Sequence, residues 1–272
     1  MMDNGTNQDD SDPWFRLAVG PGPVAAAAIH AGHAVRPPVA ARLALDESQR
    51  LREEDPFTDQ WTSVAPTRIV GCRSRFEIDL NRPREGAIYR TPDEAWGLGV
   101  WRGEFDEQTA ARSLEIYDAF YRAVAGLFDD LAARCGHFVV LDLHSYNHRR
   151  DGPGAPEADP DQNPEVNIGT STADTSRWAA TIDAFEESLR QADFDGQGHH
   201  LDVRRNIRFT GGHFARWTHA RYGSRALVLA VEFKKFFMDE WSGQEDRDRV
   251  EGIRRALAGT VPTLERTLDQ IP

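Results

Sequence analysis

The apolar residues of this 272-residue chain gather in three short runs that predict buried β-strands. The runs cover residues 23–29, 139–143 and 226–233. A near-continuous apolar run is typical of a strand that helices cover on both faces of a sheet. Each run leads into polar residues, and in open α/β sheets ligands bind at the carboxyl ends of the strands. The pattern therefore predicts a functional site at one edge of a sheet.

Between these runs, helical periodicity is strongest over residues 107–134, where Gly136 would end the helix. Further helical patterns cover residues 38–52, 175–192 and 246–268. Weaker strand patterns cover residues 69–72 and 203–209. Alternating strands and helices predict an α/β fold of three layers, with a mixed central β-sheet flanked by helices.

The first residues are acidic and polar, so we expect residues 1–13 to be disordered or loosely attached. Residues 14–272 contain no clear linker or repeat and are expected to form a single domain. There is no pattern of a signal peptide and no apolar run long enough to span a bilayer. The two cysteines, Cys72 and Cys135, lack the spacing of a metal site. These features favour a cytoplasmic protein.

The formal net charge of −12 makes nonspecific binding to nucleic acid or to an anionic membrane unfavourable. We therefore expect neither of these partners. A local basic pocket for a small anionic ligand remains compatible with this charge.

The second apolar run carries Asp142 and His144, which lie two residues apart and so point to the same side of a strand. A carboxylate beside an imidazole orients the ring in metal sites and in general bases. A buried histidine whose hydrogen bonds are satisfied internally is the alternative. His30 follows the first run, and there it either contributes to the same site or begins a polar loop.

Three acidic residues precede Pro56 and have two interpretations. Residues 53–55 either form a solvated helix end or provide a carboxylate to a site that includes His30. Two imidazoles and one carboxylate are the ligand set of a hydrolytic zinc site that leaves a position for water. Glu232 ends a strongly apolar strand and would be unfavourable there unless paired or functional. A separate glutamate of this kind can serve as the general base.

Apolar and polar residues roughly alternate over residues 74–80, which would suit a strand. One face would then carry Arg75, Glu77, Asp79 and Asn81. Together with Arg82, the arginine and the asparagine suggest a clamp for a carboxylate or a phosphate, because a guanidinium binds a carboxylate through two parallel hydrogen bonds. An internal ion pair of Arg75 with Glu77 or Asp79 is the alternative.

These residues occur in an order that resembles the N-formylglutamate amidohydrolase family from about residue 24 to residue 240. The matching pieces are His30-Ala31-Gly32, the acids ending at Asp55 with Thr58-Asp59, Ser74-Arg75, Asp79-Leu80-Asn81-Arg82, Asp142-Leu143-His144-Ser145, Asn167-Ile168-Gly169-Thr170, Gly211-Gly212 and Val231-Glu232. The family is similar to zinc carboxypeptidase and aspartoacylase hydrolases. The resemblance implies a phosphorylase/hydrolase-like fold of the zinc-carboxypeptidase type, with an eight-stranded mixed sheet between helices.

The resemblance also implies the reaction and the roles of individual residues. The substrate would be a small anionic N-acyl amino acid such as N-formyl-L-glutamate, whose amide is cleaved with one Zn²⁺ or another divalent metal. The implied metal ligands are His30, Asp55 and His144, with Glu54, Glu53 and His33 as alternatives to Asp55. Glu232 would be the general base, and Asp142 would orient a histidine. Substrate binding would fall to Arg75, Asn81 and Arg82, with Arg75 also polarising the scissile carbonyl.

Two segments are more basic and aromatic than is typical of the family, residues 146–150 and 232–240. They indicate a second anionic group on the substrate or a different N-acyl amino acid. Two alternative functions remain open at this point. One is a zinc carboxypeptidase-like peptidase or amidase that acts on short peptides or cell-wall fragments, and the other is a non-catalytic carboxylate-binding protein.

Overall fold

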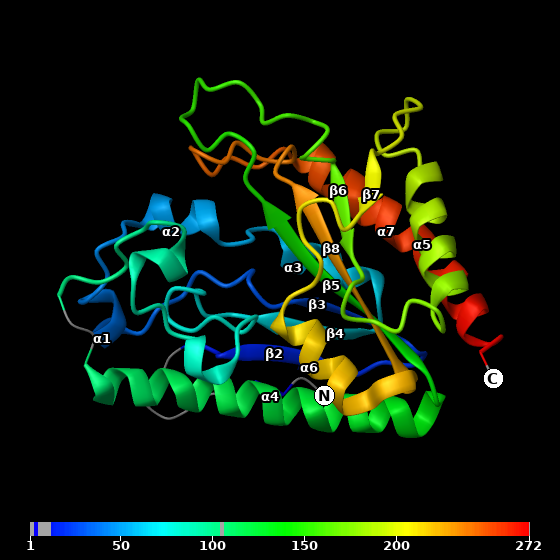
Figure 1. Ribbon diagram of the computed structural model, residues 1–272, viewed down its shortest axis with the longest axis horizontal. Coiled ribbons are helices and arrows are strands. Elements are labelled where there is room, and N and C mark those ends of the chain that lie inside the picture. The colour runs from blue at the N-terminus through cyan, green and yellow to red at the C-terminus, as the bar shows by residue number, and fades with distance from the viewer. Residues whose placement is uncertain (1–2, 5–11, 104–105, 272) are drawn as a thin grey trace.

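A computed structural model describes residues 3–4, 12–103 and 106–271, in which a mixed β-sheet lies between two layers of helices (Figure 1). The strands are β1 (Asp3–Asn4), β2 (Phe15–Ala18), β3 (Val24–Ala28), β4 (Thr67–Gly71), β5 (Phe138–Tyr146), β6 (Val166–Gly169), β7 (Val203–Arg205) and β8 (Ala226–Lys234). The α-helices are α1 (Pro37–Ala40), α2 (Glu47–Glu53), α3 (Thr58–Trp61), α4 (Glu107–Cys135), α5 (Ala179–Gln191), α6 (His213–Tyr222) and α7 (Arg247–Leu268). Short 3-10 helices are η1 (Thr62–Val64), η2 (Arg84–Gly86), η3 (Pro92–Ala95) and η4 (Gly223–Arg225). The predicted three-layer α/β fold is confirmed.

The described strands form one eight-stranded sheet in the order β1-β2-β4-β3-β5-β8-β6-β7. Strands β4, β3, β5 and β8 run parallel, whereas β2 and β6 join this central group antiparallel to their neighbours. Parallel order brings the carboxyl ends of β3, β5 and β8 to the same edge of the sheet. The polar groups that follow the three predicted strands therefore lie at one edge.

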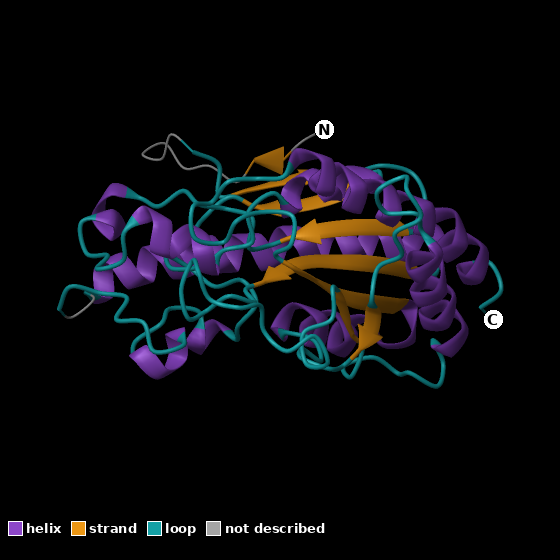
Figure 2. Cartoon of the chain, turned by 90° about the horizontal axis from the view of Figure 1, so that it is seen from above, coloured by secondary structure: helices purple, strands orange, loops and turns teal. Residues whose placement is uncertain are grey.

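The central strands are apolar throughout because each face of the sheet packs against its own helices (Figures 1 and 2). In β3, Ala25 and Ala27 belong to the core formed with α4 and α6. Val24 and Ala26 belong to the core formed with α3, α5 and α7. Successive side chains of a strand point to opposite faces, so a strand buried on both sides shows no polar alternation.

The two long helices begin and end close to the predicted residues. Asp106 caps α4 by accepting a hydrogen bond from the Thr109 N–H, and Gly136, with a φ of 74°, ends it. Asp246 caps α7 in the same way through the Arg249 N–H. The amphipathic patterns over residues 107–134 and 246–268 were therefore sufficient to locate both helices.

Four local predictions are corrected. The helix expected over residues 38–52 is split into α1 and α2, because Asp46 starts a new helix with a capping box. The helix expected to begin at residue 175 begins at Ala179. Strand β7 ends at Arg205, because Asn206 adopts a left-handed conformation with a φ of 53°. Residues 74–80 form turns and not a strand.

The predicted loose segment 1–13 lies mostly outside the described residues. Asp3 and Asn4 are described, and they pair with Leu17 and Arg16 at the edge of the sheet. Among the described helices, none is both long enough and apolar enough to cross a membrane.

Candidate active site

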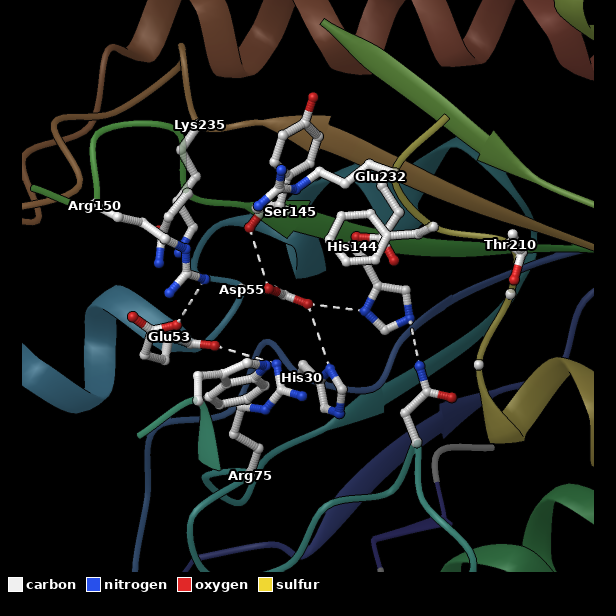
Figure 3. A pocket seen from close by; sticks show the side chains of 18 residues that line it. His30, Glu53, Asp55, Arg75, His144, Ser145, Arg150, Thr210, Glu232 and Lys235 are labelled. Carbon is white, nitrogen blue, oxygen red and sulfur yellow. Dashed lines mark hydrogen bonds and ion pairs between the residues drawn. The ribbon is translucent and has the colours of Figure 1, made fainter. Parts of the chain in front are cut away.

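A cavity of about 590 Å³ opens at the carboxyl ends of β3, β5 and β8 (Figure 3). Its lining side chains come from segments far apart in the chain. They are His30, Glu53, Asp55, Arg75, Asn81, Trp96, His144, Ser145, Tyr146, Asn147, Arg150, Arg208, Phe209, Thr210, Gly211, Gly212, Glu232 and Lys235. Most of the residues that the sequence singled out therefore share one cavity.

His30, Asp55 and His144 converge at the base of this cavity, as Figure 3 shows. The Oδ2 atom of Asp55 lies 2.8 Å from Nδ1 of His144 and 3.5 Å from Nδ1 of His30. One potential ligand atom from each residue lies within 4.8 Å of those of the other two. The three side chains could hold a single metal ion.

A second carboxylate contacts the far side of each imidazole. Asp79 Oδ1 lies 2.8 Å from Nε2 of His30, and Asp142 Oδ1 lies 3.0 Å from Nε2 of His144. A carboxylate in this position accepts the Nε2 proton, which leaves the Nδ1 lone pair directed towards Asp55. The orienting role predicted for Asp142 matches this geometry. Asp79 has the same geometry, which the sequence did not reveal because residues 74–80 resembled a strand.

Asp55 is held in place by its own backbone and by Lys235. The Asp55 N–H donates to the His30 carbonyl over 3.0 Å, and the Lys235 ammonium donates to the carbonyls of Arg52 and Glu54. Glu53, Glu54 and Asp55 are 7%, 1% and 2% exposed, so the interpretation of residues 53–55 as a solvated helix end is wrong. Burial alone would raise the pKa of Asp55, but hydrogen bonds with His144 and His30 hold that pKa far below its ordinary value.

Glu54 and His33 pair with each other outside this group. Glu54 contacts His33 Nδ1 through one oxygen and Ser74 Oγ through the other, while Arg50 lies 3.6 Å away. Neither residue belongs to the convergent group. Of the three adjacent buried acids of residues 53–55, only Asp55 contacts His30 and His144.

Glu232 lies next to His144 across the β5–β8 pairing and lines the cavity. Within the part of the chain that the structure describes, its carboxyl group makes no hydrogen bond and no ion pair. Burial raises the pKa of Glu232 from 4.5 to about 7. A carboxyl group with this pKa can both accept and release a proton near neutral pH.

Arg75 lines the cavity, but its guanidinium is already paired. It donates to Asp79 Oδ2 over 2.9 Å, to the Tyr89 hydroxyl over 3.1 Å and to the Glu53 carbonyl over 3.2 Å. It also lies over the Trp96 ring, 4.7 Å from the centroid. The predicted internal ion pair with Asp79 therefore exists, and it holds the Arg75 side chain in the wall of the cavity.

The two other residues expected to bind substrate differ in position. Asn81 lines the cavity, with Nδ2 3.5 Å from Nε2 of His144. Arg82 is not among the lining residues, because its guanidinium donates to the Glu94 carbonyl and lies over the Tyr89 ring. The structure thus brings Asn81, but not Arg82, to the cavity.

Three basic residues of the cavity were not predicted as site residues: Arg150, Arg208 and Lys235. Arg150 and Lys235 were partly indicated by the sequence, since they lie in the two unusually basic segments. Arg208 could not be recognised as a site residue from the sequence, because it is a single arginine in a short loop after β7.

Carboxylates outnumber cations around the histidines. Asp55, Asp79, Asp142 and Glu232 surround them, and Arg75 supplies the neighbouring positive charge. Burial alone would lower the pKa of His144, but the charges of Asp142 and Glu232 and hydrogen bonds to Asp142 and Asp55 raise that pKa well above its ordinary value. Such an excess of buried negative charge is what a divalent cation neutralises. Two imidazole nitrogens and a carboxylate oxygen suit zinc.

A sequence profile described as N-formylglutamate amidohydrolase matches residues 22–237 of the chain. A comparison with curated proteins found no match. The crystal structure of N-formylglutamate amidohydrolase from Ralstonia eutropha JMP134 is similar with a TM-score of 0.69 and 18% identity, over 94% of this chain and 97% of that one. The gene product Atu2144 from Agrobacterium tumefaciens is similar with a TM-score of 0.63 and 19% identity, over 94% and 93%.

At these identities the two structures establish the fold alone, whereas the profile spans most of the chain. The chain belongs to the N-formylglutamate amidohydrolase family and is an amidohydrolase acting on a non-peptide C–N bond.

Proposed function

We propose that this protein hydrolyses the N-formyl amide of an acidic amino acid, with N-formyl-L-glutamate as the first substrate to test, and that it uses one zinc ion. The observation that carries the proposal is the convergence of His30, Asp55 and His144 beside the unpaired carboxyl group of Glu232. The family membership supports the same reaction.

The metal would be held by Nδ1 of His30, Nδ1 of His144 and the carboxylate of Asp55. A zinc ion at this position supplies Lewis acidity, which polarises a carbonyl and lowers the pKa of water towards neutrality. Asp79 and Asp142 keep both imidazoles in the tautomer and the orientation that this ligand set requires.

Glu232 is the general base of the proposed reaction. Its carboxylate takes a proton from the attacking water and returns the proton to the nitrogen of the leaving amine. Burial raises the pKa of Glu232 to about 7 in the metal-free protein, so its carboxyl group can both accept and release a proton near neutral pH.

Arg75 and Asn81 contact the substrate from the β4 side of the cavity. The Arg75 guanidinium is held rigidly by Asp79, Tyr89 and Trp96, so its positive charge is in position before the reaction starts. It stabilises the negative charge that develops on the carbonyl oxygen. Arg82 acts indirectly, since it lies 3.8 Å from Asp79 and packs over Tyr89.

The test is release of formate from N-formyl-L-glutamate by the purified zinc-loaded protein, compared with amino acid release from short peptides. We expect formate and glutamate in equal amounts and no peptide cleavage. Glu232→Gln should keep its metal and lose about 10²–10⁴-fold in kcat, because proton transfer is removed while the metal ligands remain. Cleavage of peptides without formate release would instead identify a carboxypeptidase-like enzyme. Binding without any turnover would identify a carboxylate-binding protein.

A further inference from the structure

The arginines that line the cavity differ in how their charges are compensated. Arg75 pairs with Asp79, and Arg150 pairs with Glu53 over 3.3 Å. Arg208 forms no ion pair with any carboxylate in the described ranges 3–4, 12–103 and 106–271. Of these lining arginines, Arg208 is therefore the one whose positive charge is not neutralised by the protein itself.

Neutral groups orient the Arg208 guanidinium. Its Nη1 donates to Asn163 Oδ1 over 2.8 Å. The guanidinium carbon lies 5.3 Å from the centroid of the Tyr146 ring and 5.5 Å from that of Phe209. These contacts orient the exposed guanidinium and leave its charge available to a ligand.

The backbone around Arg208 is held by the fully buried side chain of Asn167. Asn167 Oδ1 accepts hydrogen bonds from the N–H groups of Ile207 and Arg208 over 3.0 and 2.9 Å, and Nδ2 donates to the Phe209 carbonyl over 2.8 Å. Asn167 is also the β6 partner of Glu232 in the β6–β8 pairing. The sheet therefore holds the arginine in a fixed relation to the strand that carries Glu232, which lowers the cost of ordering it on binding.

The basic segments that the sequence singled out do not provide an equivalent group. Arg149 pairs with Glu157 over 3.1 Å, and Arg150 pairs with Glu53. The Lys235 ammonium is buried against the carbonyls of Arg52 and Glu54. Lys235 also forms no ion pair with a described carboxylate, but its ammonium is already bonded to two carbonyls. Among the lining arginines and Lys235, Arg208 is therefore the one that remains available to a substrate carboxylate.

We propose that Arg208 binds a carboxylate of the substrate and so determines the preference for acidic N-acyl amino acids. This inference rests on the proposed function. A guanidinium presents a planar fork of N–H donors that matches a carboxylate through two parallel hydrogen bonds. An uncharged amide in place of the carboxylate would leave part of that fork unpaired.

The test combines Arg208→Gln with three substrates: N-formyl-L-glutamate, N-formyl-L-glutamine and N-formyl-L-isoglutamine. The last two replace the side-chain and the α-carboxylate, respectively, by an amide. We expect the variant to raise KM for N-formyl-L-glutamate by about 10- to 100-fold, with a smaller change in kcat, because a hydrogen-bonded charge is lost. For the substrate that lacks the bound carboxylate, KM should be nearly unchanged, and this identifies which carboxylate Arg208 binds. An equal loss with all three substrates, or no loss, would overturn the proposal.

Arg204→Gln is the matched control, because Arg204 lies on β7, pairs with Asp202 over 2.8 Å and is not among the cavity-lining residues. It should leave all three KM values unchanged. Thermal unfolding of both variants checks that they fold.

Calorimetric binding of L-glutamate and L-glutamine to the zinc-loaded protein separates this inference from the proposed function. A preference for L-glutamate that Arg208→Gln abolishes would support the inference even if no hydrolysis is detected. If formate is released but neither KM nor ligand preference depends on Arg208, the inference fails while the proposed function stands.

Discussion

The two sides of the cavity differ in how fully their charged groups are paired. Around β3, His30, Asp55 and Asp79 each contact at least two other side chains, and Arg75 donates to three protein acceptors. Around β8, Glu232 has no hydrogen-bonding or ion-pairing partner among the described residues, and Arg208 contacts only neutral groups. Both sides are walls of one cavity.

This difference corresponds to two functions of the cavity, which are to hold a metal ion and to interact with water and substrate. The paired side is a rigid frame whose geometry persists without a ligand, as a metal site requires. The unpaired side keeps charged groups free to interact with water and substrate, and the protein bears the cost of leaving the half-buried carboxyl group of Glu232 without a described partner.

The largest expected effect comes from Asp55→Asn. This change removes the carboxylate between the two histidines, so zinc affinity should fall by more than about 100-fold, beyond the loss typical for groups that only orient ligands. Zinc affinity is measured by competition with a chromogenic chelator.

Glu54→Gln is the matched control for Asp55→Asn, because Glu54 is an equally buried neighbour that pairs with His33 and Ser74. It should retain zinc and lose roughly 1–3 kcal/mol of stability through its weakened hydrogen bonds. If Glu54→Gln loses zinc and Asp55→Asn keeps it, the carboxylate ligand has been assigned to the wrong residue.

An intermediate effect is expected from the carboxylates behind the histidines. Asp79→Asn and Asp142→Asn should each lower zinc affinity by about 10- to 100-fold, because the imidazoles lose the acceptor that fixes their tautomer. Asp118→Asn, at an exposed ion pair with Arg84, is the control and should bind zinc normally. Wild-type affinity in both buried variants would show that the frame does not depend on these pairs.

The smallest expected effect concerns the stability of the metal-free protein as a function of pH. The pKa of Glu232 is about 7 in the folded protein, against an ordinary value of 4.5, so between these values the folded state binds more protons than the unfolded state. The contribution of Glu232 to stability is complete below pH 4.5 and is lost as pH rises through 7. Glu232→Gln should therefore be more stable than wild type at pH 8 by about 1–3 kcal/mol relative to their difference at pH 4.5.

Urea unfolding of both proteins at the two pH values measures this change. An unchanged difference in the free energy of unfolding would mean that the Glu232 carboxyl group is solvated or paired, and it would remove the contrast between the two sides of the cavity.

The elements that could be predicted from sequence are those whose pattern is local. The apolar runs located β3, β5 and β8, and amphipathic periodicity located α4 and α7. Helix α6 was not predicted, although it begins directly after Gly211-Gly212.

In the site, too, the residues that could be predicted from the sequence are those with a local pattern. The polar residues at the strand ends identified His30, His144 and Glu232, because a charged or polar residue is conspicuous after an apolar run. The burial of residues 53–55 could not be predicted, since their hydrogen-bonding partners lie in segments distant along the chain. Arg208 is a functional candidate only because of its surroundings. Tyr146 and Asn163 contact its guanidinium, and no carboxylate in the described part of the chain pairs with it.

The Asn167 side chain has a consequence for substrate length. The residue pairs with Glu232 within the sheet and also holds the loop of residues 207–209, so the backbone positions of the base and the arginine are set by the register of two strands. The spacing between the base and the arginine would then select substrates by their length. If Arg208 binds the side-chain carboxylate, an acyl amino acid one methylene shorter or longer could bring its amide to the base or that carboxylate to the arginine, but not both at once.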